Sequence, residues 1–148
     1  MVERRHPPRD LVLSSEKIHV WRVSVAQHVC ARSELRSVLS SQERDPEARF
    51  HFAADHDQFL VAHGLLRILT ARYPGKEPRQ FRFSLNPLGK HNLERPANKT
   101  DLHFNLSHSK GVVLWAFGKG RQVGVDVERI HHSGDFQQIA ERHFSPAE

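Results

Sequence analysis

Two acidic residues near the end of the sequence have a spacing that suits a metal ion. Residues 124–128 read GVDVE, so one residue separates Asp126 from Glu128. On a β-strand these side chains emerge on the same face, roughly 6.5 Å apart, where like charges repel. A divalent cation would offset that repulsion, and Mg²⁺ commonly takes one or two carboxylates together with phosphate oxygens. The alternative is a solvent-facing strand that carries two acids and no metal.

The neighbouring residues predict how the two acids are presented. The valines at positions 123, 125 and 127 alternate with Gly124, Asp126 and Glu128, which predicts a buried apolar face and an opposite face that carries both acids. Gly124 has no side chain, so it leaves space beside Asp126 for a bulky ligand. Asp126 and Glu128 are therefore candidate metal ligands, and the residues of this segment alone leave the metal-free strand open as the alternative.

The elements that must position these acids are a small sheet and a long helix. Alternating residues predict strands at 18–26, 80–85, 102–107, 111–118 and 122–129, and residues 118–120 (GKG) offer a turn between the last two. Residues 112–117 are apolar on both faces, which predicts a central strand. Helical spacing occurs in residues 30–40, from Ser40 onward with a capping box to Glu43, and most clearly at about 54–73. We expect an α+β fold in which a small antiparallel sheet packs on the long helix.

Composition describes a soluble globular chain without naming a partner. The 148 residues carry a net charge of +5, which attracts anions such as phosphorylated cofactors, acidic proteins or nucleic acid. Cys30 is the single cysteine, and no apolar leader follows the charged N-terminus, so we expect a cytoplasmic protein. The longest apolar run, residues 112–117, is far shorter than the roughly 20 residues of a membrane span. We expect no membrane segment.

Two motifs at this separation carry a family resemblance. The stretch FNLSHS at residues 104–109, followed by GVDVE, resembles the first two motifs of the 4'-phosphopantetheinyl transferases, in particular the large pseudo-dimeric type that activates surfactin synthetase. The resemblance continues through residues 39–73 and NPLGK at 86–90, and covers nearly all of residues 15–148. It implies one half of a fold built from two α+β halves. It also implies transfer of the phosphopantetheine arm of coenzyme A to a serine of an acyl or peptidyl carrier protein.

The resemblance also assigns roles to single residues. Asp126 and Glu128 match the two ligands of Mg²⁺, and Ser107 and His108 match residues that line the coenzyme A phosphates. For His108 the alternative is a surface imidazole at a strand end. Lys90 matches a lysine that contacts phosphate as a point charge. No catalytic residue other than the metal ligands is implied in this half.

Several positions depart from the family pattern. Gln58 stands where the resemblance leads us to expect an arginine for the nucleotide phosphate, and Glu43 and Pro46 stand where some members have basic residues. His91 replaces a usual proline. We expect a lowered affinity for the nucleotide, with Arg44 and Arg49 as basic candidates nearby or, alternatively, as merely solvated helix arginines.

The sequence predicts an N-terminal arm at residues 1–15, an α+β lobe at 16–132, and the start of a connection to a missing C-terminal lobe at 133–148. The sequence predicts the start of a helix at Ser145, Pro146 and Glu148. The family's third motif, W-x-x-K-E-A, is absent. We expect little or no transferase activity from the chain alone. Two chains could also pair through the exposed half of the natural interface.

Other function classes remain as alternatives. A nucleic-acid-binding domain would fit the charge, but the basic residues are not clustered with aromatic ones and match no docking pattern. The twelve histidines invite a zinc site, yet their spacing is irregular and no paired cysteine or H-E-x-x-H motif accompanies them. A third possibility is a non-catalytic module that binds coenzyme A or a carrier protein.

Overall fold

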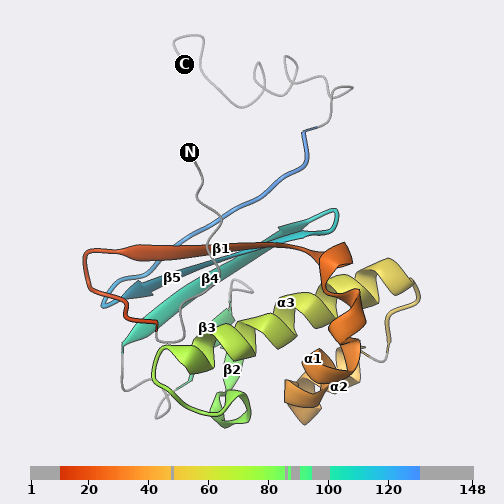
Figure 1. Cartoon of the computed structure of the whole chain (residues 1–148), viewed down its shortest axis with the longest axis horizontal. Helices are drawn as coiled ribbons and strands as arrows, with labels where there is room; N and C mark the ends of the chain where they lie inside the picture. The colour runs from red at the N-terminus through yellow and green to blue at the C-terminus, as the bar shows by residue number, and fades with distance from the viewer. Residues whose placement is uncertain (1–10, 48, 86, 88–90, 95–100, 131–148) are drawn as a thin grey trace.

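A three-stranded antiparallel sheet covers one side of a long helix (Figure 1). The computed structural model describes residues 11–47, 49–85, 87, 91–94 and 101–130. Their elements, in chain order, are β1 (Ile18–Ser24), the 3-10 turns η1 (Val25–Gln27) and η2 (Val29–Ala31), α1 (Arg32–Val38), α2 (Ser41–Glu47), α3 (Ala53–Arg72), η3 (Pro78–Gln80), β2 (Phe83–Leu85), β3 (His91–Leu93), β4 (Leu102–Ser109) and β5 (Val112–Lys119).

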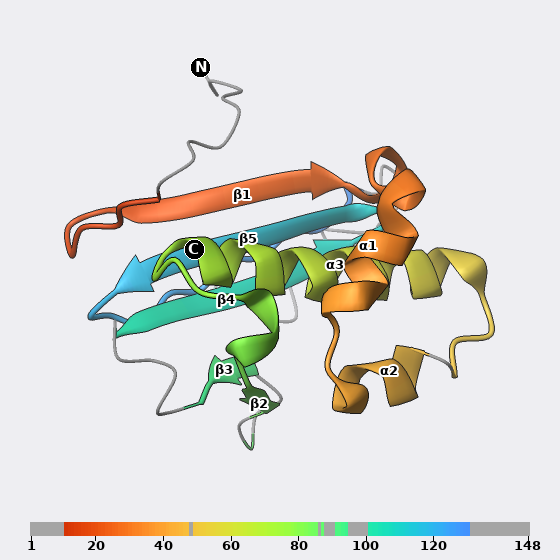
Figure 2. The ribbon, with the colours of Figure 1, turned by 60° about the horizontal axis from the view of Figure 1, so that its bottom comes forward.

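The strand order of the larger sheet is β1-β5-β4, so β5 is central, as its apolar residues on both faces predict. Its inward residues Val113, Trp115 and Phe117 are completely buried against α3. In Figure 2 the three strands lie side by side, and α3 runs across their face with α1 and α2 near its N-terminal end. The expected α+β arrangement, a small antiparallel sheet packed on a long helix, is confirmed.

Two of the predicted strands differ from the structure. The strand expected at residues 80–85 is present only as β2 (Phe83–Leu85), and it pairs with β3 in a separate two-stranded sheet instead of joining the larger one. Residues 122–129 form no strand. Strand β1 and strand β4 occupy the two edges of β5, so the chain that leaves β5 finds no free edge there after its turn at Gly120, which has φ +71°.

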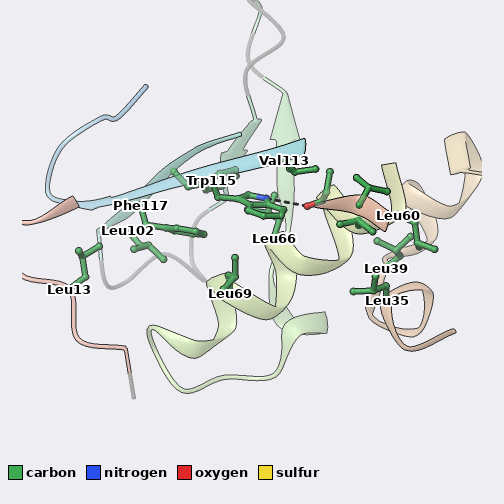
Figure 3. Packing of buried hydrophobic residues seen from close by; sticks show 14 residues of the cluster. Leu13, Leu35, Leu39, Leu60, Leu66, Leu69, Leu102, Val113, Trp115 and Phe117 are labelled. Carbon is green, nitrogen blue, oxygen red and sulfur yellow. Dashed lines mark hydrogen bonds between the residues drawn. The ribbon is translucent and has the colours of Figure 1, made fainter. Parts of the chain in front are cut away.

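The core lies between α3 and the sheet. Leu60 and Leu66 of α3 are fully buried and belong to one cluster with Trp115 and Phe117 (Figure 3). Burying a side chain of this size stabilises the fold by about 1.5–3 kcal/mol. The indole Nε1 of Trp115 donates a hydrogen bond of 3.2 Å to the carbonyl oxygen of Ala62, so the polar atom of this buried ring is satisfied.

The helix boundaries follow local signals. The capping box is present, because the Glu43 amide donates to Ser40 Oγ at 3.3 Å and Glu43 Oε2 accepts from the Ser40 amide at 2.8 Å. Pro46, which the sequence placed in a first turn or at a break, lies inside α2 one residue before the helix ends. The long helix begins at Ala53 and ends at Arg72, one residue from each predicted boundary.

The described residues also bear on the predicted ends of the lobe. Leu11 and Leu13 fall within the predicted arm but are 5% and 7% exposed, and Leu13 belongs to the core cluster. The predicted helix start at residues 145–148, and the boundary at 133, lie outside the described residues. Within the part of the chain that the structure describes, no helix is both long and apolar enough to cross a membrane.

Candidate functional site

The segment that carries the two acids is tied to β4 by side chains instead of a backbone ladder. The Val125 amide donates to Asn105 Oδ1 at 2.7 Å, and the Val127 amide donates to Ser107 Oγ at 3.1 Å. Asn105 and Ser107 alternate along β4 with Phe104 and Leu106, which belong to the core or pack against it. The segment therefore lies beside the face of β4 that is turned away from the core, which explains why it is extended without being a strand.

The predicted alternation of this segment is nevertheless present. Asp126 and Glu128 are exposed, whereas Val123 is buried and the valines at 125 and 127 are half-buried. Ser107 Oγ donates to Asp126 Oδ1 at 2.7 Å, and Ser109 Oγ donates to Glu128 Oε1 at 3.0 Å. Both carboxylates thus lie along the same polar face of β4.

Close contact with the sheet depends on Gly118. A Cβ atom at this position would lie 2.7 Å from Val123 Cγ1 and 3.3 Å from the Arg121 carbonyl oxygen. Real Cβ atoms essentially never approach another atom as closely as the first distance. The missing side chain lets Val123 pack directly on the sheet just before the acidic residues.

Ser107 and His108 are neighbours in the sequence but face opposite sides of β4. Ser107 is bonded to the acid-bearing segment, whereas His108 Nδ1 lies 2.8 Å from the amide nitrogen of Gln58 on α3. The Gln58 amide oxygen accepts a bond of 3.0 Å from the Gly111 amide in the turn between β4 and β5. Gln58, which the sequence marked only as a departure from the family, therefore links the helix to this turn.

A cavity of about 320 Å³ lies on the helix side, between α2, α3 and the β2–β3 pair. It is lined in part by Glu43, Phe59, His63, Arg67 and His91. The carboxylate of Glu43 accepts several short hydrogen bonds: Oε2 accepts from Arg67 Nε at 2.7 Å and from the Ser40 hydroxyl at 2.8 Å. Burial alone would raise the pKa of Glu43, but these bonds hold it below its usual value.

Two histidines of this cavity are uncharged near neutral pH. Burial lowers the pKa of His63 to about 4, with His91 adding to the shift, and burial also lowers the pKa of His91. The His63 ring stacks on Phe59 with a centroid distance of 4.1 Å, and its Nδ1 lies 3.9 Å from Glu43 Oε1. This cavity therefore offers a carboxylate and neutral rings, and the guanidinium of Arg67 is already engaged.

The chain is similar in sequence to several known transferases. No protein-family model matches the sequence. The 4'-phosphopantetheinyl transferase HetI of Nostoc sp. is 35% identical over 141 residues, which is 95% of this chain and 60% of that protein. The chain is a homologue of the 4'-phosphopantetheinyl transferases. Two Bacillus subtilis proteins are also similar. One, a 4'-phosphopantetheinyl transferase, is 31% identical over 77% of the chain and 48% of that protein. The other, the 4'-phosphopantetheinyl transferase Sfp, is 30% identical over 76% of the chain and 47% of that protein. The chain spans 60% of HetI and about half of the Bacillus relatives.

The remaining predicted site residues of this phosphopantetheinyl transferase homologue lie apart from the acids or outside the described part. Lys90 is outside the described residues. Arg44 is exposed, and it lines a second cavity of about 340 Å³ together with Asp45 and Arg79. Arg49 is exposed just after α2. The two basic candidates that the structure describes, Arg44 and Arg49, are thus on the α2 side, and the acids are beside β4.

Three contributors to the site have no role in the sequence-based prediction. Asn105 holds the backbone of the acidic segment, Ser109 bonds Glu128, and Gln58 bonds His108. The sequence pattern could have pointed to Asn105 and Ser109, because they form a polar face with Ser107 on a strand whose other face is apolar. The role of Gln58 depends on contacts between positions 50 and 53 residues apart, which the sequence does not reveal.

The donor set suits a hard cation. Asp126 and Glu128 offer carboxylate oxygens, which are the ligands that Mg²⁺ prefers in proteins. Across residues 11–130, as far as they are described, no group of three or more His, Cys, Asp and Glu side chains is placed to hold a metal. An ion bound by these two acids would therefore complete its coordination with water or with phosphate oxygens.

Proposed function

We propose that this chain is the N-terminal lobe of a Mg²⁺-dependent 4'-phosphopantetheinyl transferase. It would act on coenzyme A and on a serine of an acyl or peptidyl carrier protein. The observation that carries the proposal is the pair Asp126 and Glu128, both exposed and both hydrogen-bonded to serines of β4. The relationship to HetI over 95% of the chain supports the same activity.

The reaction explains why two acids would be useful in one place. A carrier serine oxygen forms a bond to phosphorus and gives up its hydroxyl proton to solvent, the phosphoanhydride bond of coenzyme A breaks, and adenosine 3',5'-bisphosphate leaves. When bound, Mg²⁺ supplies positive charge at the phosphate oxygens, which can lower the barrier by several kcal/mol. Asp126 and Glu128 would hold the ion on the polar face of β4. No other residue of this lobe is assigned a catalytic role.

The proposed phosphate contacts come from His108, Ser107 and Lys90, with Arg44 and Arg49 as further basic candidates. Because the Gln58 amide nitrogen donates to His108 Nδ1, a neutral His108 carries its proton on Nε2 and can donate it to a phosphate. The hydroxyl proton of Ser107 points to Asp126, so a phosphate contact by Ser107 would require that hydroxyl to rotate. Lys90 retains its proposed role as a point charge.

Partners and location follow the same proposal. We propose coenzyme A and a carrier protein as partners, and the cytoplasm as the compartment. Self-association through the exposed half-interface is also proposed, and specific binding of nucleic acid is not. The chain alone should have little or no transferase activity, because its relatives extend well beyond the region that it matches.

Calorimetry with coenzyme A tests the proposal on the chain itself. We expect binding that requires Mg²⁺ and that is lost in Asp126→Ala but kept in Asp45→Ala, which removes an exposed acid from α2. Binding that is identical in EDTA, or identical in Asp126→Ala, would contradict the metal assignment. Failure of coenzyme A to bind under any condition would contradict the proposed substrate.

Mass spectrometry separates the transferase from the alternative of a non-catalytic binding module. A chimera would join this chain to the part of HetI that it does not match, and would be incubated with coenzyme A, Mg²⁺ and an apo carrier protein. Addition of the phosphopantetheine mass to the carrier, abolished by Asp126→Ala, supports the transferase. A folded chimera that binds coenzyme A without modifying the carrier favours the binding module. Robust modification by the unextended chain would contradict the expected need for a second lobe.

A further inference from the structure

The two carboxylates are held in the same way, although they belong to different residue types. Asp126 Oδ1 accepts from Ser107 Oγ at 2.7 Å and from the following amide, that of Val127, at 2.9 Å. Glu128 Oε1 accepts from Ser109 Oγ at 3.0 Å and from the following amide, that of Arg129, at 2.8 Å. In each case one oxygen receives a serine hydroxyl from β4 and the next backbone N–H.

The repeat follows from the register between β4 and the acidic segment. Each serine lies 19 residues before its acid, so two steps along β4 correspond to two steps along the segment. Asn105 begins the same series, since it accepts the Val125 amide 20 residues later at 2.7 Å. The polar residues of β4 thus replace a backbone ladder and fix the segment at the point where both acids emerge.

This arrangement orients a carboxylate for a metal. A carboxylate oxygen with two donors cannot rotate freely, so the direction of the second oxygen is fixed as well. Asp126 is an exposed residue, and its Oδ2 accepts no hydrogen bond from any residue within the described part of the chain. Outer partners of this kind commonly change metal affinity by 10–100-fold when they are removed.

We infer that Ser107 and Ser109 are positioning residues that orient Asp126 and Glu128 as metal ligands, in addition to any contact with substrate. The inference rests on the proposed function, because it takes both acids as ligands of a divalent cation. Ser109 is the more informative of the two, since neither the motif resemblance nor the proposed phosphate contacts give it a role. Its hydroxyl acts on the ion only through Glu128.

The test measures Mn²⁺ affinity of the full chain by electron paramagnetic resonance, with coenzyme A present. Ser109→Ala should bind Mn²⁺ roughly 10-fold more weakly than the unsubstituted chain. Ser109→Thr keeps the hydroxyl and should restore the affinity, which a merely structural loss would not require. Ser24→Ala is the matched control, because Ser24 is a strand serine of β1 whose hydroxyl makes no hydrogen bond with the described residues.

A second measurement does not depend on the metal. The carboxyl ¹³C chemical shift of Glu128 should change in Ser109→Ala and return in Ser109→Thr, while the near-ultraviolet circular dichroism of Trp21 and Trp115 stays unchanged. A change in that dichroism together with weaker Mn²⁺ binding would mean a general loss of packing and would overturn the inference.

The outcomes distinguish the inference from the proposed function. If Asp126→Ala abolishes Mn²⁺ binding but Ser109→Ala binds as tightly as Ser24→Ala, the metal assignment stands and the positioning role is wrong. If Asp126→Ala and the unsubstituted chain bind Mn²⁺ equally, the metal assignment is wrong and the positioning role falls with it. Weakening in Ser109→Ala with recovery in Ser109→Thr supports both.

Discussion

Gln58 and His108 form a hydrogen bond of 2.8 Å that joins α3 to the end of β4. The other end of the Gln58 amide accepts the Gly111 N–H, so its nitrogen is the group that donates to His108. A single side chain therefore fixes the turn that follows FNLSHS and also the tautomer of its histidine.

Replacing Gln58 should disturb both features. In Gln58→Leu the Gly111 amide and His108 Nδ1 lose their partners, and we expect the free energy of unfolding to fall by about 1–2 kcal/mol. Two-bond ¹H–¹⁵N spectra near pH 8 should show the Nε2 proton in the unsubstituted chain and a tautomer mixture in the variant. Gln27→Leu, at an exposed position of η1, should change stability by no more than about 0.5 kcal/mol. An unchanged tautomer in Gln58→Leu would refute the assigned hydrogen bond.

His63 should make the fold sensitive to mild acid. Its pKa is lowered from 6.5 to about 4 by burial, so below pH 6.5 the unfolded chain binds a proton that the folded chain does not. The stabilisation is complete above pH 6.5 and decreases toward pH 4, by roughly 3 kcal/mol in all. His91, whose pKa is also lowered by burial, acts in the same direction.

Denaturant titrations from pH 7 to pH 4 measure this dependence. The fall in stability should be clearly smaller in His63→Gln than in the unsubstituted chain. His51→Gln, at an exposed histidine, is the control and should leave the pH dependence as it is. A parallel pH dependence in His63→Gln and the unsubstituted chain would show that His63 is not kept neutral by the fold.

Arg67 should be the most costly charged residue of α3 to remove. It is 2% exposed, and its guanidinium donates to Glu43 Oε2 at 2.7 Å and to the Phe81 carbonyl oxygen at 3.0 Å. Arg67→Met would leave the Phe81 carbonyl oxygen without this donor and the Glu43 carboxylate without its charged partner, so we expect a loss of about 3–5 kcal/mol in unfolding free energy. Arg72→Met, at the exposed end of the same helix, should cost less than about 0.5 kcal/mol. Similar losses for the two variants would argue against a structural role for the buried guanidinium.

The two acids should contribute unequally to metal-dependent binding of coenzyme A. Aspartate has one fewer rotatable bond than glutamate, so Asp126 loses less conformational entropy when it holds an ion. We therefore expect Asp126→Asn to weaken the Mg²⁺-dependent binding seen by calorimetry more than Glu128→Gln does. Stronger impairment by Glu128→Gln would reverse this order and assign the main ligand to Glu128.

Local signals predicted much of the fold. The apolar period of α3, the capping box at Ser40 and the two-sided apolar strand β5 each depend on residues close in sequence, and each is present. The partner of a strand depends on which edges are free, which no local pattern records. Residues 122–129 illustrate this. They have the alternating pattern of a strand, but the amides of Val125 and Val127 bond to the side chains of Asn105 and Ser107 instead of to a neighbouring strand.

The sequence predicted the part of the candidate site that depends on neighbouring residues, but not the contacts between distant ones. The spacing of Asp126 and Glu128 correctly predicts that both emerge on one side, because the alternation of an extended chain does not require a ladder. The division of Ser107 and His108 between two faces also follows from alternation, yet the motif treats them as one unit. The partners Gln58 and Ser109 emerge only when distant segments are brought together.

The missing side chain at Gly118 lets the acidic segment approach the sheet closely. A methyl group there would clash with Val123, three residues before the first acid. The clash would move the segment away from the serines of β4. Both carboxylates would then shift together with their charges intact. The affinity for the proposed metal would thus change through a position that itself bears no ligand atom.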